Sequence, residues 1–275
     1  MTDFDRRSVA MLALIGPLAA AAGAAAKDAA SPPAPPAPGH DMSMAPASWM
    51  GHDEVAMLVY PKMTALDLVG PQYMFASLMG AKVHLVAKTR EPVTSDTGVT
   101  ITPTATFAET PKDLTVLFAP GGTQGTLDAL LDAETRAFMA DRGSRAKYVT
   151  SVCTGSLILG AAGLLKGYKA TSHWAARDAL SDFGAIPTDE RVVIDRNRIT
   201  GAGVTAGLDF GLTMVAQLRD TDYAQSLQLL CEYDPHPPFN SGSIHTAPPQ
   251  VRAMMEAMLS PFRDQVHAAA KSIQT

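Results

Sequence analysis

The sequence predicts a doubly wound α/β domain with a mostly parallel sheet and helices on both faces. Short apolar, β-branched runs recur along the chain, at 54–60, 82–87, 114–118 and 148–152. Helical patterns separate most of these runs, and such alternation is typical of a parallel sheet covered on both sides. The run at 148–152 ends abruptly at Cys153, and a small-residue helical segment follows it. In such folds ligands bind at the carboxyl ends of the strands, so the loops that follow the strands have the greatest functional interest.

The first half of the domain is expected to supply three strands. The strand at 54–60 ends at Pro61, and a helix is expected over 70–79. A second strand covers 82–87. Residues 89–112 contain several Thr, Pro and Gly and indicate a loop or hairpin. The third strand, 114–118, leads into a glycine-rich turn.

The second half continues the alternation around the Cys153 strand. Helical patterns are expected near 124–131, 133–144 and 205–219, the last with apolar residues on one face. A final helix is expected near 249–259. Shorter strands are expected in three places: 169–172, 191–195 and 198–200.

Residues 1–26 are expected to direct export. Arg6 and Arg7 precede the largely apolar segment 9–18, and small residues continue through Ala26. The adjacent arginines match part of a twin-arginine signal, so we expect a periplasmic protein whose mature chain begins near Lys27. An uncleaved membrane anchor is the alternative. After cleavage we expect no stable membrane association, because no later segment has 18 consecutive apolar residues.

Residues 27–51 are expected to form a Pro/Ala/Met-rich linker, since proline favours extended chain. Its Met and His residues either hold Cu(I) or belong to an incidental polar tether: His40, Met42, Met44, Met50 and neighbouring His52. The folded domain is expected over 52–247, with a C-terminal helix and tail over 248–275. A net charge of −5 and a pI near 5.8 argue against a nucleic-acid surface.

Cys153 is the first candidate for chemistry. A strand, a cysteine and then a helix form a nucleophile elbow, in which the turn lifts the side chain above the sheet. A thiol at a helix N-terminus is expected to favour the thiolate. The alternative is a buried structural cysteine. A bridge to Cys231 would consume the thiol, but we expect both cysteines to be free and Cys231 to be buried in a helix.

The loops after the other strands supply the remaining candidates. Asp67 follows the first strand and is either an acid/base with a raised pKa or a helix N-cap. The N–H groups of Gly121 and Gly122, together with that of Thr154, either stabilise an anion or belong to an ordinary turn. His173 is either a base for the thiol or a core histidine.

Metal and nucleotide cofactors are not expected. The chain has no H-E-x-x-H or C-x-x-C motif, which would indicate a metal or redox site. The glycine-rich turn at 120–125 matches neither of the common phosphate-binding patterns, and Gly201 to Gly207 lacks the full dinucleotide spacing.

These segments resemble the ThiJ/PfpI superfamily, which shares the class I glutamine amidotransferase-like fold, and within it the isonitrile hydratase branch. Each stretch that carries the resemblance lies within about residues 54–250: Leu66 to Pro71, Pro120 to Thr123, Tyr148 to Leu165, Thr171 to Trp174, Gly184 to Pro187, Gly201 to Phe210, Glu232-Tyr233 and Pro237 to Gly242. The pairing of Asp67 with Cys153-Thr154 carries the likeness to that branch. Thr154 stands where peptidase-like members have His.

The resemblance implies a cofactor-free hydratase that adds water to an isonitrile and gives an N-substituted formamide. By position, Cys153 is then the nucleophile, with Asp67 and Thr154 as its catalytic partners. Gly121, Gly122 and His173 are expected to stabilise charge or bind the small-molecule substrate. The resemblance also implies a homodimer. The alternatives are a non-enzymatic ligand-binding or oxidation-sensing protein, or a glyoxalase- or deglycase-like enzyme.

Overall fold

A computed structural model describes residues 44–274 of the chain. Ala45 to the C-terminus forms one compact unit. The predicted export signal and most of the predicted linker, with His40 and Met42, lie outside the described residues. No helix within 44–274 is long and apolar enough to cross a membrane.

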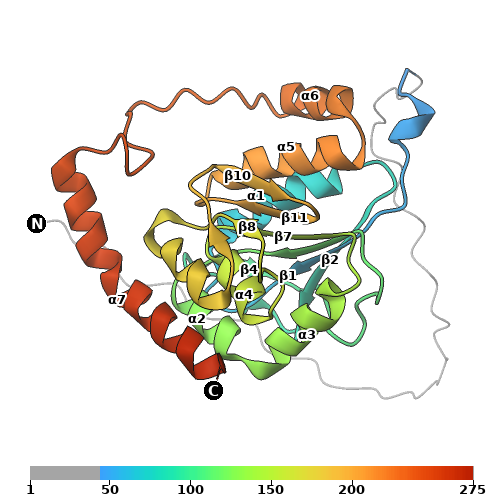
Figure 1. The fold of residues 1–275 in the computed structure, drawn as a ribbon. Coiled ribbons are helices and arrows are strands. Elements are labelled where there is room, and N and C mark those ends of the chain that lie inside the picture. The colour runs from blue at the N-terminus through green and yellow to red at the C-terminus, as the bar shows by residue number, and fades with distance from the viewer. Residues whose placement is uncertain (1–43, 275) are drawn as a thin grey trace, which may run out of the picture. The chain divides into compact units, whose positions relative to one another are not determined.

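The fold class is confirmed, because a mostly parallel sheet lies between helices (Figure 1). In the described part of the chain the main sheet has the order β10-β11-β7-β6-β1-β2-β5, and only β10 is antiparallel to its neighbour. Its strands are β1 (Glu54–Leu58), β2 (Lys82–Ala87), β5 (Ala105–Thr106), β6 (Val116–Ala119), β7 (Tyr148–Val152), β10 (Val192–Asp195) and β11 (Arg198–Gly201). The chain runs from β1 to one edge and then returns to β6 beside β1. The winding therefore reverses between β1 and β6, where a ligand site is expected.

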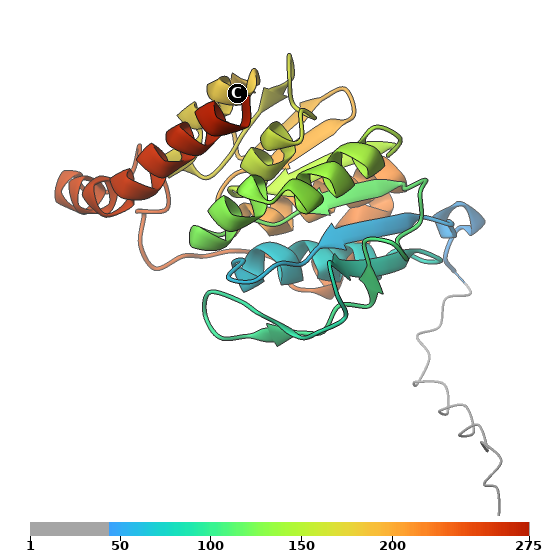
Figure 2. The ribbon, with the colours of Figure 1, turned by 90° about the horizontal axis from the view of Figure 1, so that it is seen from below.

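Helices cover both faces of this sheet (Figures 1 and 2). One face carries α1 (Ala65–Ala76) and α5 (Ala206–Leu218), with α6 (Thr221–Leu230) packed on α5. The other carries α2 (Gln124–Leu131), α3 (Ala133–Gly143) and α4 (Gly155–Ala161). Phe75 of α1, Phe118 of β6 and Phe210 of α5 are fully buried, with ring centroids 5.6–6.3 Å apart. This aromatic cluster fixes α1 and α5 against the strands that carry the candidate site.

Smaller elements complete the fold. Residues 89–112 contain the hairpin of β3 (Val93–Thr94) and β4 (Thr100–Ile101), as the loop-or-hairpin prediction allowed, and also the edge strand β5, which was not predicted. A separate parallel pair joins β8 (Lys169–Ala170) to β9 (Ile186–Pro187). The 3-10 helices η2 (Trp174–Ala176) and η3 (Asp178–Phe183) lie between those two strands.

Several predicted bounds were wrong. Helix α1 begins at Ala65 rather than 70, so Pro71 lies inside it and Asp67 in its first turn. Helix α6 was missed. The last helix, α7 (Pro249–Gln274), continues well beyond 259 and through Pro261. It does so because Val266, Ala269 and Ala270 in its second half are buried in the core.

The end of the predicted linker is also more structured than expected. Residues Ala47–Trp49 form the short 3-10 helix η1. The Trp49 indole donates a hydrogen bond to Asp220 at 2.9 Å, and Arg219 donates to the Trp49 carbonyl at 2.7 Å. Trp49 also packs on Tyr223, with ring centroids 4.7 Å apart. These contacts fix the chain just before β1.

Candidate active site

Three strand ends meet where the winding reverses. Asp67 lies in the first turn of α1, shortly after β1; Gly121 and Gly122 follow β6; Cys153 follows β7. Because β1, β6 and β7 are parallel neighbours, their carboxyl ends lie at one edge of the sheet. A bridge between Met63 and Gly122 joins the first two loops. The structure thus brings together the sequence-predicted residues from all three loops.

Cys153 has the backbone of a strained elbow. Its φ is +57°, in the left-handed region that non-glycine residues rarely adopt. Its N–H donates to the Ala202 carbonyl at 2.7 Å, and its carbonyl accepts from the Ser156 and Ser172 hydroxyls, each at 3.1 Å. Gly155 completes the turn, since a Cβ there would lie 2.1 Å from the Ala119 carbonyl oxygen. The surrounding structure therefore holds a conformation that would otherwise cost about 1–3 kcal/mol.

The Asp67 carboxyl is fully buried beside the thiol. Its Oδ2 accepts the Gly121 N–H at 3.0 Å, while its buried Oδ1 has no hydrogen-bond partner among the described residues. Burial raises the pKa of Asp67 to about 7, against the lowering effects of the Cys153 thiol and the Gly121 N–H. The N-cap alternative is wrong, because Thr64 is the N-cap residue of α1. Asp67 has the pKa of a group that can both accept and deliver a proton near neutrality.

Burial and the charge of Asp67 both act against a thiolate at Cys153. Cys153 is only 5% exposed. Burial, and then the charge of Asp67, raise the pKa of Cys153 well above its ordinary value, although the Thr154 N–H acts in the opposite direction. The expectation that the helix N-terminus would favour the thiolate is therefore wrong, because desolvation outweighs it. Ionising this thiol requires a nearby acceptor for its proton, and Asp67 is adjacent.

Gly121 and Gly122 hold the site together rather than present free donors. The Gly121 N–H bonds Asp67, and the Gly122 N–H donates to the Thr154 hydroxyl at 2.9 Å. Both N–H groups are thus occupied by protein acceptors, in contrast to the expected anion-binding hole. Thr154 is buried, and its hydroxyl also lies 2.9 Å from that of Thr126. Thr126, which lies in α2 directly after the glycine-rich loop, was not predicted as a site residue.

His173 does not act as a base for the thiol in this arrangement. It is the N-cap residue of η2, and its Nδ1 accepts the Ala175 N–H at 3.3 Å. Burial, and then the charge of Arg177, lower its pKa, so it is neutral. It lines a cavity of about 340 Å³ together with Ala202, whose carbonyl accepts from Cys153. His173 is therefore near the elbow without forming a Cys–His pair.

Both cysteines are free, as predicted, so no bridge consumes the elbow thiol. Cys231 is partly exposed at the C-cap of α6 rather than buried within a helix. No group of three or more His, Cys, Asp or Glu suited to a metal ion occurs within residues 44–274.

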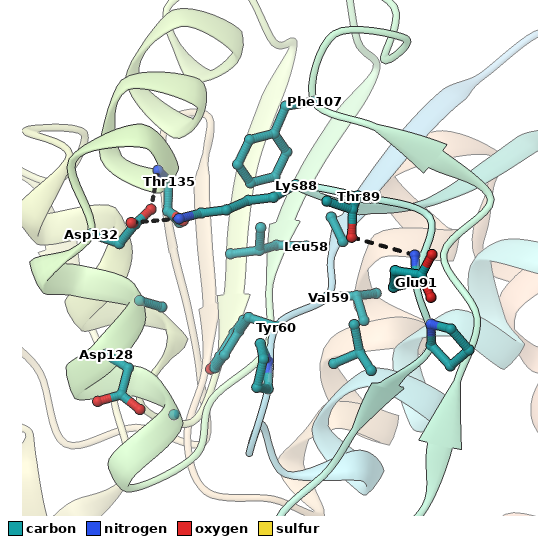
Figure 3. A pocket seen from close by; sticks show the side chains of 16 residues that line it. Leu58, Val59, Tyr60, Lys88, Thr89, Glu91, Phe107, Asp128, Asp132 and Thr135 are labelled. Atoms are coloured by element: carbon teal, nitrogen blue, oxygen red, sulfur yellow. Dashed lines mark hydrogen bonds and ion pairs between the residues drawn. The ribbon is translucent and has the colours of Figure 1, made fainter.

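A second cavity, of about 470 Å³, opens between the ends of β1 and β2 and helix α2 (Figure 3). Leu58, Val59 and Phe107 form apolar walls, and Lys88 reaches across to Asp132 at 2.5 Å. Tyr60 also lines it, while the Tyr60 hydroxyl bonds the Pro120 carbonyl behind it. Cys153 and Asp67 do not line this cavity, so the thiol chemistry lies outside it.

Comparisons with known proteins agree with this geometry. Residues 53–217 match the DJ-1/PfpI family. The chain is 50% identical to the isonitrile hydratase of Pseudomonas putida over 198 residues, which cover 72% of this chain and 86% of that one. It is also 31% identical over 136 residues to a deglycase of Thermococcus kodakarensis, covering 49% of this chain and 81% of that one.

A solved structure extends the likeness over a larger share of the chain. The crystal structure of a ThiJ/PfpI family protein from Pseudomonas syringae is 67% identical. It superposes with a TM-score of 0.81 and covers 87% of this chain and 98% of that one. The matched region includes all three loops that form the candidate site. The chain therefore belongs to the DJ-1/PfpI family.

Proposed function

We propose that this protein is a cofactor-free hydratase that converts an isonitrile and water into an N-substituted formamide. The observation that carries the proposal is the buried Asp67–Cys153 pair, in which a carboxyl with a pKa of about 7 lies beside a thiol whose pKa is raised by burial. The likeness to isonitrile hydratase supports the same substrate class.

The proposed first step forms two bonds at one carbon. The ionised Asp67 accepts the Cys153 proton, the sulfur attacks the terminal isonitrile carbon, and Asp67 returns the proton to that carbon. The product is a thioimidate, R–N=CH–S–Cys. A carboxyl that changes protonation state near neutral pH suits both halves of this transfer.

The second step consumes water and restores the thiol. Asp67 takes a proton from water as the oxygen adds to the thioimidate carbon and passes it to the nitrogen, which gives R–NH–CH(OH)–S–Cys. Asp67 then takes the hydroxyl proton as the C=O bond forms and the C–S bond breaks, and delivers it to the leaving sulfur. The products are R–NH–CHO and the free thiol. Over both steps one isonitrile and one water become one formamide, with no redox change.

An oxidation-sensing role is less well supported by the site. Cysteine oxidation follows thiolate character and exposure. Here burial raises the pKa of Cys153 and leaves it 5% exposed. Both effects disfavour a reactive sensor thiol and favour a thiol that is activated only beside its base.

The test is turnover of cyclohexyl isocyanide by the purified protein, with the formamide product followed by NMR. We expect turnover by the wild type and by Cys231→Ala, which removes only the second, partly exposed thiol. Cys153→Ala should abolish it with an unchanged melting temperature. If a folded wild-type protein leaves a panel of alkyl and aryl isonitriles untouched but consumes 2-oxoaldehydes, the glyoxalase-like alternative replaces this proposal.

We also propose a homodimer. Exposed Leu66, Val69 and Tyr73, at 48%, 47% and 40%, follow one another along α1 at spacings that put them on one side of the helix. An apolar helix side of this kind is suited to contact with a second copy. Light scattering at micromolar concentration tests this, and a monomeric mass would reject it.

Export to the periplasm also remains a proposal, resting on Arg6, Arg7 and the apolar segment 9–18. Mass spectrometry of the protein from a periplasmic fraction should find a chain that begins near Lys27. An intact N-terminus in the cytoplasmic fraction would contradict it.

A further inference from the structure

Two buried residues that the proposed mechanism does not use, Thr126 and Tyr60, contact the catalytic loops. We infer that Thr126 is a positioning residue that fixes the Thr154 hydroxyl, and that together with Tyr60, which holds the Pro120 carbonyl, it keeps the Gly121 N–H on the Asp67 carboxylate. The inference deepens the proposed function and rests on it only for its turnover readout. The evidence for this role is the number of hydrogen bonds that each hydroxyl can donate and accept.

The Thr154 hydroxyl is fully used by the protein. A hydroxyl has one hydrogen to donate and two lone pairs to accept. The Gly122 carbonyl, 2.5 Å away, can only accept, so Thr154 donates its hydrogen there. The Gly122 N–H, at 2.9 Å, occupies one lone pair. The second lone pair must then accept from the Thr126 hydroxyl at 2.9 Å.

The same count separates Tyr60 from this pair. Thr126 uses its single hydrogen on Thr154. The Tyr60 hydroxyl donates its single hydrogen to the Pro120 carbonyl at 2.8 Å. Neither hydroxyl has a hydrogen left for the 3.2 Å contact between them, so Tyr60 holds the loop at Pro120 and Thr126 holds it through Thr154. All three residues are buried.

The result is a loop in which every polar backbone group from the Pro120 carbonyl to the Gly122 carbonyl has a partner. Pro120 is held by Tyr60, and both groups of Gly122 by Thr154. Between them, the Gly121 carbonyl accepts the Thr64 N–H at 2.8 Å, and the Gly121 N–H bonds Asp67 at 3.0 Å. The position of that last donor therefore depends on hydrogen bonds at both ends of the loop.

Two consequences distinguish this role from simple packing. The Thr154 hydroxyl has no free hydrogen or lone pair for a substrate, so a loss on its removal reflects the loop rather than a lost substrate contact. The Gly121 N–H lowers the pKa of Asp67. A loop that drifts away from the carboxylate must therefore move the titration of Asp67 to higher pH.

The experiment uses the full protein in a Cys231→Ala background, so that Cys153 is the only thiol. Three variants are compared with that parent: Thr126→Val, Thr126→Ser and Tyr60→Phe. Thr110→Val is the matched control, because Thr110 is also a buried threonine whose hydroxyl donates to a backbone carbonyl, in the loop after β5. Alkylation of Cys153 by iodoacetamide is measured from pH 5 to 10, and kcat and KM for cyclohexyl isocyanide are measured in parallel.

The plot of alkylation rate against pH should have an inflection where Asp67 titrates. In Thr126→Val we expect this inflection to move to higher pH. We expect kcat to fall about 10- to 100-fold with little change in KM, as for ångström-scale misplacement of reacting groups. Thr126→Ser, which restores the hydroxyl, should return both readouts toward the parent. Tyr60→Phe should show a smaller effect in the same direction, and Thr110→Val none.

Two outcomes would overturn the inference: a parental pH profile and kcat in folded Thr126→Val, or a Thr126→Ser variant as impaired as Thr126→Val, which would indicate packing alone. If Thr126→Val does not fold, Tyr60→Phe decides by the same criteria. Absence of isonitrile turnover in the parent would reject the proposed function, while the alkylation profiles would still decide the role of Thr126.

Discussion

Asp67→Asn should speed alkylation of the Cys153 thiol but slow the turnover of substrate. The amide keeps the shape of the carboxyl and can still accept the Gly121 N–H, but it carries no charge and accepts no proton. The charge of Asp67 is the second cause, after burial, of the raised pKa of Cys153. Removing that charge should lower the thiol pKa and speed alkylation. Turnover should nevertheless fall, because the proton has no acceptor.

The size of the loss follows from the proton transfers that Asp67 performs. The lower thiol pKa makes ionisation easier in the variant, so thiol ionisation does not reduce its turnover. Without the carboxylate, no positioned group carries the proton from sulfur to carbon or takes one from water, and such transfers typically contribute about 10²–10⁴-fold.

Both readouts are measured in the Cys231→Ala background, with alkylation rates across pH beside kcat/KM. Asp128→Asn is the matched control, because Asp128 is an exposed carboxylate on α2 that pairs with Lys62 at 3.6 Å. It should leave both readouts unchanged. Turnover within threefold of the parent, or a thiol pKa that does not fall, would refute the assignment of Asp67 as the base.

Three further predictions concern the same site. Because burial raises the pKa of Asp67 from 3.8 to about 7, the folded chain binds this proton more tightly than the unfolded chain. That contribution is complete below pH 3.8 and is lost as the pH rises to 7. Urea unfolding should therefore show the wild type losing stability relative to Asp67→Asn, by at most about 1.4 kcal/mol per pH unit, between pH 4 and 7; a constant difference would contradict the raised pKa. Gly121→Ala should cost about 1–3 kcal/mol in thermal or urea unfolding and most of the activity, because its Cβ would lie 2.5 Å from the Thr154 nitrogen and 2.8 Å from Asp67 Oδ2. A variant with wild-type kcat would show that the loop can shift freely. His173→Ala should reduce kcat/KM less than Asp67→Asn does, since the ring bonds Ala175 rather than the thiol; the reverse order would indicate a Cys–His mechanism.

The local pattern of apolar residues in the sequence was sufficient to predict the α/β architecture and the position of the Cys153 elbow. Apolar, β-branched runs located β1, β2, β6 and β7, because buried parallel strands are apolar on both faces. The strand–Cys–helix order placed Cys153 at a carboxyl end, and the loops of Asp67 and Gly121 followed from the same rule. These predictions needed only periodicity and the topology that periodicity implies.

The start of α1 could not be read in the same way, because tertiary packing overrides a local signal. Gly70-Pro71 is typical of a helix start, since proline is favoured in the first turn. In the structure Pro71 lies inside α1, where it packs against α5. Gly207 permits this approach: a Cβ there would lie 3.2 Å from the Pro71 ring. The misplaced start also put Asp67 in a loop rather than in the first turn of a helix.

The electrostatic state of the site depends on burial, which a sequence does not display. A helix N-terminus after Cys153 favours a thiolate, and that argument would hold for an exposed thiol. Here Cys153 and Asp67 are both buried, and desolvation raises the pKa of both. The support that Tyr60 and Thr126 give to the Gly121 loop could not be predicted for a related reason, because these residues and Thr154 come from three separate segments.

Burial of both groups gives the pair a chemistry that neither has alone. Two interacting groups titrate as a unit, and the site near neutral pH holds one readily transferred proton between sulfur and carboxylate. Hydration of an isonitrile requires a sulfur–carbon bond and a carbon–hydrogen bond at the same atom. An exposed thiolate would supply the first bond but would leave the second to solvent. A buried thiol that ionises only by giving its proton to Asp67 places that proton beside the carbon that must receive it.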